Sequence, residues 1–448
     1  MFPLFLPKLR DLQLLNDDAI YSFLQNSDAT VSTTHSIVKF GGSSLASSSA
    51  WRKVIDHIKM GQLDQPLIVV VSAIGKTTRS LVGCVDYATR AELNNVDRGL
   101  TEIWQTHKEI ALECIDPSLQ VNEANQSRTS LEEKIDTFLD QLHVEAMSVA
   151  KDLQGHPAPL SSSYGDAMLS FGERATSQIF QWVLQGSGIP SIAVDAREVI
   201  LTDEQHGAAS VSRDKLHSAL VKHPALASFW SAIQSENPSS QIPVPVLGGF
   251  IGRSHSGLPT TLGFEGSDLT ATLLAEATEA MNVTIFTDVD GIMTTDPRLV
   301  PTAKHIPSLS YDEAEDLALA GARILHPDTL SPVMSQGLPV RVRNTFNSDH
   351  PGTLIESLDS SSTHRPYREG WKAIAMALIH QDTSTSILTF LHATPEGQSQ
   401  LRHWSESYAL PLEIDDRGWH LHVPYLHADH PNPAFPLTLQ SIHDIFFP

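Results

Sequence analysis

The sequence of 448 residues is poor in cysteine and in positive charge. Its two cysteines, Cys84 and Cys114, are too few for a disulfide framework or a four-cysteine zinc site. Lysine and arginine number 30 against 52 aspartates and glutamates, a formal net charge of −22. Such a surface repels nucleic acid and anionic lipid. We therefore expect neither as a partner, and the scarcity of cysteine favours the reducing cytoplasm.

Long apolar runs are also missing. No run approaches the roughly 18 residues that a membrane-spanning helix needs. The opening MFPLFLPKLR has too few apolar residues before Pro7 and Lys8 for a secretory signal. Residues 1–36 are therefore expected to form a polar N-terminal extension. At roughly 100–200 residues per domain, two to four domains are expected.

The sequence does contain alternating strand-like and helix-like segments. Continuous β-branched runs such as LIVVVSA are typical of strands buried on both faces of a parallel sheet. Strand patterns separated by helical periodicity occur at 37–40, 67–73, 191–196, 245–252, 282–287 and 338–344. This alternation predicts an α/β fold with a mainly parallel sheet.

The pattern changes near residue 357. The serine-rich residues 357–369 are expected to be a linker. Residues 370–448 show the order strand, strand, helix, strand, strand, helix, which predicts a small α+β module. Its histidines are more typical of solvated surface than of a metal centre, and no metal ligand is predicted.

The segment VKFGGSS is the first candidate for chemistry. A strand that ends in Gly41 and Gly42 before a helix offers bare backbone N–H groups to an anion, and Lys39 adds a positive charge. This arrangement suits nucleotide phosphates. A simple tight turn explains the glycines equally well.

A second strand-end turn, VVVSAIGKTT, resembles a P-loop only superficially. A P-loop needs a glycine five residues before Gly75, and Val70 stands there. What remains is a turn rich in hydroxyl groups, including Thr78. Downstream, Glu173 in SFGERATSQ could be a solvated helix residue, and Asp268 in FEGSD could be a simple helix cap.

The loop TDVDGIMTTDPR, residues 287–298, follows a predicted strand. Its acidic residues and Arg298 fall at the strand's carboxyl end, where open α/β sheets bind ligands. An EF-hand is excluded because the twelfth loop position is not a glutamate. The loop is thus a candidate ligand site.

Taken together, these motifs resemble the aspartokinases of the amino acid kinase family. The resemblance covers about 37–355, and its motifs stand in the family's order: KFGGSS, VVVSAIGKTT, SFGE, GFIGR, TTLGFEGSD, TDVDGIMTTDPRLV, LSYDEAEDLALAGARILHP and RNTFNSDHPGT. It implies an αβα sandwich over 37–356, with an amino-acid-binding lobe (37–245) and an ATP-binding lobe (246–356). It also implies that 370–448 is an ACT-like module.

The resemblance further implies roles for individual residues. Lys39 and Asp268 would be catalytic, with Lys39 on the transferring phosphate and Asp268 orienting it. Thr78, Glu173 and Arg253 would contact the amino acid, with Glu173 facing its ammonium group. The nucleotide contacts would be Lys39, Gly41, Gly42, Ser43, Thr287, Asp288, Arg298 and Arg323.

The chain departs from the family pattern before GSD. The family carries an arginine that holds the substrate's α-carboxylate, and Phe264 stands at that position. Phenylalanine cannot replace a guanidinium in this task. Four interpretations remain open. Arg253 or Arg79 would reach the carboxylate, the substrate would be an aspartate relative without a free α-carboxylate, the activity would be low, or the chain would be a non-catalytic member of the family.

The resemblance implies ATP-dependent phosphorylation of the β-carboxylate of L-aspartate, with Mg²⁺ on the phosphates. This is the first step of the aspartate-derived amino acid pathway, which includes lysine biosynthesis. An acyl kinase for a modified aspartate and a non-catalytic ATP-binding homologue are the alternatives. A homodimer is expected. Aspartokinases usually carry a tandem pair of ACT modules that bind a feedback amino acid, and the roughly 79 residues of 370–448 can hold only one. Inhibition by lysine or threonine is therefore doubtful.

Overall fold

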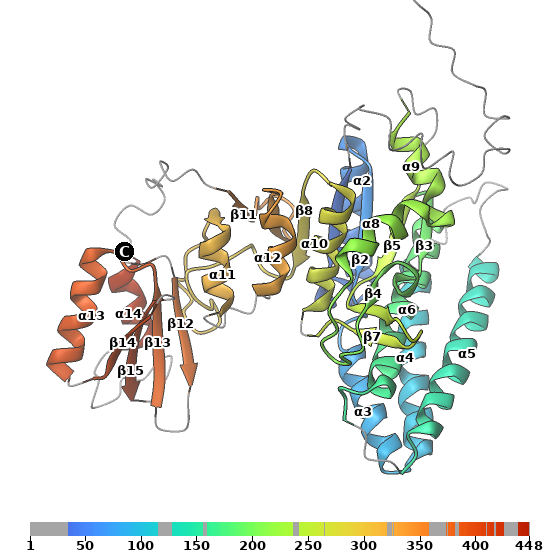
Figure 1. Ribbon diagram of the computed structural model, residues 1–448, viewed down its shortest axis with the longest axis horizontal. Helices are drawn as coiled ribbons and strands as arrows, with labels where there is room; N and C mark the ends of the chain where they lie inside the picture. Colours follow the sequence, from blue (N-terminus) through green and yellow to red (C-terminus); the bar gives the residue numbers. More distant parts are fainter. Residues whose placement is uncertain are drawn as a thin grey trace, which may run out of the picture. The chain divides into compact units, whose positions relative to one another are not determined.

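A computed structural model describes most of the chain from His35 onward (Figure 1). The expected N-terminal extension lies outside the described residues apart from 35 and 36, as do most of the expected linker and the positions of Phe264 and Arg323. The described residues are 35–114, 128–155, 159–235, 242–263, 265–319, 325, 327–357, 373, 375–380, 385–408, 410–415, 418–424 and 438–447.

An eight-stranded sheet forms the centre of the fold. Neighbouring strands are parallel except for the antiparallel pair β10 and β11. In spatial order the strands are β3 (Ser191–Val194), β5 (Val244–Gly248), β2 (Leu67–Val71), β1 (Ser36–Phe40), β8 (Val283–Thr287), β10 (Val340–Asn344), β11 (Thr353–Glu356) and β9 (Ser308–Ser310). The prediction of an α/β fold with a mainly parallel sheet is confirmed.

Alternate residues of the central strands enter two separate cores. Ile37 and Ile68 pack into one apolar cluster, whereas Val38 and Val69 pack into the other. Successive side chains of a strand point to opposite faces, so helices must cover both faces. The result is the expected αβα arrangement in three layers.

One core is covered by helices from the first half of the chain. Trp51 is fully buried there and meets Phe180 edge to face, with ring centroids 5.0 Å apart. Ser47 caps the first of these helices by accepting a hydrogen bond from the amide of Ala50. These helices are α2 (Ser48–Asp64), α3 (Thr77–Thr89), α4 (Leu93–Cys114), α5 (Arg128–Asp152) and α6 (Ser163–Gly186).

The other core is covered mainly by later helices. Leu274 and Leu330 are fully buried in it. Its helices are α8 (Arg213–Lys222), α9 (Ala227–Ile233), α10 (Gly266–Thr278), α11 (Tyr311–Leu319) and α12 (Pro327–Met334). The shorter elements are α7 (Ala196–Val199) and the 3-10 turns η2 (Ser43–Leu45) and η3 (Pro224–Leu226).

The segment 245–252, expected as one strand, is two strands in two sheets. After β5 the chain turns at Gly249 and Phe250, and Phe250 has a φ of +66°. It continues in a three-stranded sheet of β4 (Leu201–Thr202), β6 (Ile251–Ser254) and β7 (Pro259–Thr261). An apolar run does not reveal such a break, because residues on both sides of it are buried.

The tail forms the expected small α+β module. Its antiparallel sheet has the order β12-β13-β15-β14. The strands are β12 (Ala375–His380), β13 (Thr385–Leu391), β14 (Leu412–Ile414) and β15 (Trp419–Pro424), accompanied by α13 (Pro395–Tyr408) and α14 (Leu439–Phe446). The predicted order of strands and helices is therefore confirmed.

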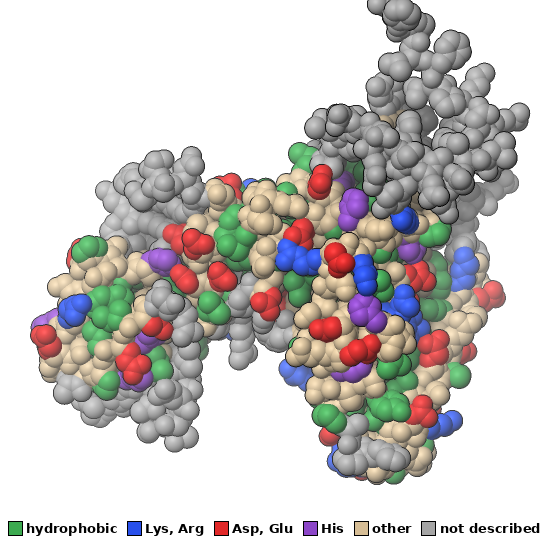
Figure 2. All heavy atoms as spheres, in the orientation of Figure 1, with side chains coloured by type: hydrophobic (Ala, Val, Ile, Leu, Met, Phe, Trp, Pro, Cys, Tyr) green, Lys and Arg blue, Asp and Glu red, His purple; other side chains and the backbone are tan. Residues whose placement is uncertain are grey.

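Two features bear on the chain's environment. Among the described residues, no helix is long and apolar enough to cross a membrane. Cys84 and Cys114 are both buried free thiols. On the face drawn in Figure 2, acidic side chains are spread over the described surface, as the net charge of −22 leads one to expect.

Candidate active site

Lys39 and Asp268 form the centre of the candidate site. Lys39 lies near the carboxyl end of the central strand β1, and Asp268 lies in the first turn of α10. Their Nζ and Oδ1 atoms are 2.5 Å apart, and the two side chains are only 10% and 6% exposed. A buried ion pair at the carboxyl edge of a parallel sheet, beside a helix N-terminus, is suited to an anionic ligand.

The glycine turn after β1 contacts the turn after β2. Gly75 donates its amide hydrogen to the Gly42 carbonyl, with N and O 2.9 Å apart. A Cβ on Gly42 would stand only 3.0 Å from the Ala73 oxygen. A side chain is thus disfavoured at Gly42, whereas a Cβ on Gly41 would make ordinary contacts 3.6 Å from Lys39 Nζ and from the Phe286 oxygen. Ser43 beside the turn is exposed.

Glu173, on α6, is a buried carboxylate with one open oxygen. Its Oε1 accepts a hydrogen bond from the Ala73 amide at 3.1 Å, whereas its buried Oε2 has no hydrogen-bond partner. Burial raises the pKa of Glu173 to about 8, and the Ala73 hydrogen bond only partly opposes this. An orphaned buried oxygen of this kind suits a cationic ligand group.

Two glycines bring α6 and α10 to the end of β5. A Cβ on Gly248 would stand 3.0 Å from the Glu173 Cβ, and a Cβ on Gly249 would stand 2.7 Å from the Ser267 Cα. Only glycine permits both approaches. Glu173 and the first turn of α10 therefore meet at the same strand end, although sequence reasoning did not assign these two glycines a role.

Glu265 is a further acidic residue that the motif analysis did not select. It precedes α10 in the left-handed region, with a φ of +55°, and its Oε2 is buried without a hydrogen-bond partner. Burial and, less strongly, the charge of Asp268 raise the pKa of Glu265 to about 7, although the charge of Lys39 partly opposes them. Its strained backbone conformation was the missing signal, and the sequence does not reveal it.

The expected amino acid contacts are only partly brought together. Thr78 is half-buried in the first turn of α3, close in sequence to Ala73, which bonds Glu173. Arg253 is exposed on β6 and donates its Nε–H to the Arg197 carbonyl, with N and O 3.0 Å apart. Phe264 lies outside the described residues.

The expected nucleotide contacts lie on the loop after β8. Thr287 donates to Asp288 Oδ1 at 3.2 Å. Arg298 is 82% exposed and forms a forked ion pair with Asp296, which raises the pKa of Arg298. This loop follows β8, which is parallel to β1 and pairs with it. Thr287 and Asp288 therefore lie at the same carboxyl end of the strands as Lys39. Arg323 lies outside the described residues.

A pocket of about 360 Å³ lies beside this site and not on it. Loop residues 208–211, Leu262 and Gly263 line one side, and residues of α10 and α12 line the other. Lys39, Glu173 and Asp268 do not line it. We assign the site by the ion pair and the orphaned oxygen, since these carry chemistry. No group of three or more His, Cys, Asp or Glu side chains among the described residues could hold a metal ion.

Comparison with known proteins gives a consistent result. The model of the amino acid kinase family matches residues 36–344. Aspartokinase 1 of Arabidopsis thaliana, a chloroplastic protein, is 34% identical over 325 residues, which are 71% of this chain and 51% of that protein. The aspartokinase of Chlamydia pneumoniae is 32% identical over 74% of this chain and 64% of its own length.

Solved structures agree with this match. Aspartokinase III of E. coli, crystallised with aspartate and ADP, has a TM-score of 0.62 and 25% identity, covering 92% of this chain and 83% of that one. The same protein with lysine and aspartate gives a TM-score of 0.60. The chain spans about half the length of the curated Arabidopsis relative.

Proposed function

The chain belongs to the amino acid kinase family, and on this premise we propose that it transfers the γ-phosphate of ATP to the β-carboxylate of L-aspartate. The product would be 4-phospho-L-aspartate. The aspartokinase relatives and the E. coli structure with aspartate and ADP support this choice of substrates.

The orphaned oxygen of Glu173 carries the proposal. A buried carboxylate that has one oxygen bonded by a backbone amide and one oxygen open is a receptor for an ammonium group. The ammonium would supply the missing countercharge and keep Glu173 ionised. An α-amino acid thus fits the site better than a substrate without an amino group.

Lys39 and Asp268 have complementary tasks in this proposal. Phosphoryl transfer is catalysed mainly by positioning and by neutralising charge on the phosphoryl oxygens. Lys39 would neutralise that charge, and Asp268 would hold its ammonium group in place through the 2.5 Å contact. Backbone N–H groups of Gly42 and Ser43 would add neutral donors, whereas the Gly41 amide already donates to the Phe286 carbonyl, with N and O 3.3 Å apart.

The loop 287–298 would bind the nucleotide. Thr287, Asp288 and Arg298 are its proposed contacts, with Arg323 as a further cation near the phosphates. Mg²⁺ is usually held by one or two carboxylates together with phosphate oxygens and water. It would supply additional charge neutralisation on the phosphates.

One observation favours a second candidate, an acyl kinase for a modified aspartate. Phe264 stands where relatives of this type are expected to carry arginine, and Arg253 is exposed and bonded to the Arg197 carbonyl. A substrate whose α-carboxylate is masked would need no cation at this place.

A hydroxamate assay distinguishes these candidates. The protein is incubated with ATP, Mg²⁺ and hydroxylamine, and with L-aspartate, its α-amide or its α-methyl ester. Aspartyl hydroxamate formed from free aspartate supports the proposal. Product from the masked substrates alone supports the second candidate. The absence of any product, with ATP still bound, indicates a non-catalytic homologue.

The wider setting follows from the same resemblance. We propose a homodimer that works in the cytoplasm at the start of the pathway from aspartate to lysine and related amino acids. The two buried free thiols agree with a reducing compartment. We also propose the lobes 37–245 and 246–356 for the amino acid and for ATP.

A further inference from the structure

The α-carboxylate of the substrate needs a partner. If Glu173 binds the ammonium group, as proposed above, a carboxylate enters the same enclosed site and must be paired. Lys39 is already paired with Asp268. Arg253 is exposed on β6, and Arg79, the other candidate from the sequence, is exposed on α3. Position 264 holds phenylalanine. A different cation is therefore required.

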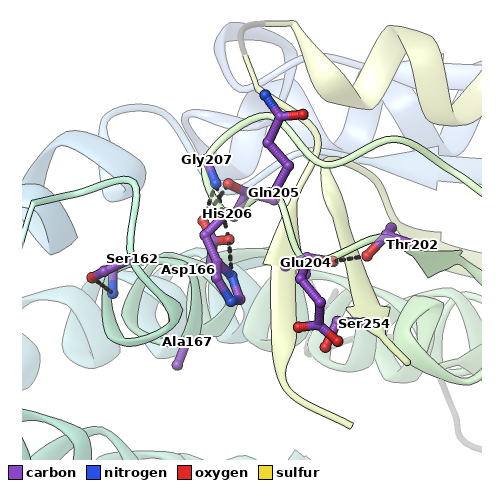
Figure 3. A network of polar contacts seen from close by, with 12 residues as sticks. Ser162, Asp166, Ala167, Thr202, Glu204, Gln205, His206, Gly207 and Ser254 are labelled. Carbon is purple, nitrogen blue, oxygen red and sulfur yellow. Dashed lines mark hydrogen bonds and ion pairs between the residues drawn. The ribbon is translucent and has the colours of Figure 1, made fainter. Parts of the chain in front are cut away.

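Asp166 organises a buried network at the start of α6 (Figure 3). It is fully buried and accepts hydrogen bonds from His206 Nδ1 at 2.8 Å, from the Gly207 amide at 3.0 and 3.1 Å, and from Thr261 Oγ1 at 2.5 Å. Figure 3 shows the His206 ring and the Gly207 nitrogen directed at its carboxylate.

Asp166 is the ion-pair partner of His206 when the imidazole is protonated. Among the described residues, no lysine or arginine pairs with Asp166, and its ion pair is with His206. A fully buried carboxylate needs a countercharge, which a doubly protonated imidazole supplies. Glu204, exposed on the same loop, adds a second negative charge near the ring.

The network lies close to the proposed amino acid site. Asp166 and Glu173 are seven residues apart on α6, so they share one helix face about 10 Å apart along the axis. On the other side, Gly207 and Ala208 pack against Gly263, since a Cβ there would stand 3.4 Å from the Gly207 oxygen and 3.6 Å from the Ala208 Cα.

The loop is also tied to the strand that leads to α10. Ala209 donates its amide hydrogen to the Thr261 carbonyl, with N and O 2.9 Å apart. Gly263 lies two residues after the end of β7 and precedes the first turn of α10 with Asp268. His206 is thus held between the Glu173 helix and the turn from which the family's arginine would reach the substrate.

His206 has one donor to spare. Its side chain is 15% exposed, and within the described part of the chain the ring's hydrogen-bond partner is Asp166, through Nδ1. When both ring nitrogens carry hydrogen, Nδ1–H donates to Asp166 and Nε2–H is left to donate to a ligand. We propose that His206, held by Asp166, binds the α-carboxylate of the amino acid substrate in place of the arginine that position 264 lacks.

This assignment narrows the substrate class. An imidazolium selects a free, negatively charged α-carboxylate, through a charge-assisted hydrogen bond. The substrate is then an unmodified α-amino dicarboxylic acid. Asp166 acts as a positioning residue, because it touches His206 and not the substrate.

The test compares charged and uncharged substrates. His206→Ala and His206→Gln are assayed with L-aspartate and with its α-amide, which differs at the α-carboxylate alone. We expect kcat/KM for aspartate to fall at least about tenfold through KM, while values for the amide and the KM for ATP change little. Asp166→Asn should act in the same direction. His223→Ala, which breaks the ion pair of the largely buried His223 with Glu198, is the matched control.

Direct binding separates this assignment from the proposed function. Aspartate binding to the full chain is measured by calorimetry in two conditions, with ATP present so that turnover can occur and without ATP. Wild type that binds aspartate but forms no product overturns the kinase activity alone, and the His206 variants are then compared by affinity. Equal losses for aspartate and its amide, unchanged affinity in His206→Ala, or a selective loss in Arg253→Ala would overturn the role of His206. If wild type binds no aspartate, both are wrong.

Discussion

Lys39 Nζ and Asp268 Oδ1 lie 2.5 Å apart and join the central strand β1 to the first turn of α10. These two residues come from opposite halves of the matched domain. Removing one partner of a buried ion pair leaves an uncompensated charge, whereas removing both can be tolerated. The pair therefore couples the stability of the fold to the integrity of the site.

Lys39→Met should abolish phosphoryl transfer without abolishing ATP binding. Loss of one donor to the transferring group costs about 100-fold or more in rate. ATP should still raise the melting temperature, because the adenosine contacts are proposed on the loop 287–298. Adding Asp268→Asn to Lys39→Met should bring the melting temperature back towards that of wild type, but it should not bring back the activity. Near wild-type turnover by Lys39→Met would contradict the assignment.

Glu173 should make the ligand-free protein less stable as the pH rises. Burial raises the pKa of Glu173 from 4.5 to about 8, so between these values the folded protein holds a proton that the unfolded chain has released. The free energy of unfolding then falls with increasing pH in this range. Glu173→Gln removes this loss. The melting temperature of Glu173→Gln relative to that of wild type should therefore increase from pH 5 to pH 8. If the two proteins show parallel curves of melting temperature against pH, the carboxyl is not buried as described.

Lysine and threonine at millimolar concentration should leave the rate unchanged. The described residues of the tail form one four-stranded sheet with two helices. The resemblance leads us to expect two such modules where a feedback amino acid is bound. Rates are measured with each amino acid added, and glycine serves as a control. Strong inhibition by lysine or threonine would refute this prediction.

His443 should support the nucleotide loop. It is fully buried on α14, and its Nε2 lies 2.9 Å from Thr294 Oγ1, within the 287–298 loop. Burial lowers the pKa of His443, so the ring is a neutral hydrogen-bonding partner. His443→Ala should raise the KM for ATP about fivefold, the value of one buried hydrogen bond of ~1 kcal/mol, and spare the KM for aspartate. His392→Ala, which removes the partner of Asp316, is the control. Equal KM values for ATP in both variants would exclude the coupling.

Phe264→Arg should lower the KM for aspartate. A guanidinium at this position can form two charge-assisted hydrogen bonds with a carboxylate. The gain should be larger in a His206→Ala background, where no other cation serves the carboxylate. Steady-state kinetics of the two single variants and the double variant measure this coupling. Additive effects would mean that the two positions do not share a ligand.

The candidate site residues that could be selected from the sequence are those that lie in regular strand-turn-helix segments. Lys39, Glu173 and Asp268 follow recognisable strand-turn-helix patterns, and the structure brings Glu173 and the first turn of α10 to one strand end through Gly248 and Gly249. Glu265 was not selected from the sequence, because its left-handed backbone conformation depends on packing. Asp166 and His206 were not selected either. Their hydrogen bond connects a helix to a loop that is distant in sequence, and no local sequence pattern indicates that contact.

The position of β1 has a consequence for the order of folding. Its neighbour β8 begins far along the chain, with Ile37 beside Val283, while its other neighbour β2 follows within the same supersecondary unit. During synthesis, one edge of β1 has no hydrogen-bonded neighbour until β8 has been made. Strand pairings between such distant segments form slowly. A nascent chain that stalls before residue 283 would expose this apolar edge, so it should bind chaperones more strongly than the finished protein.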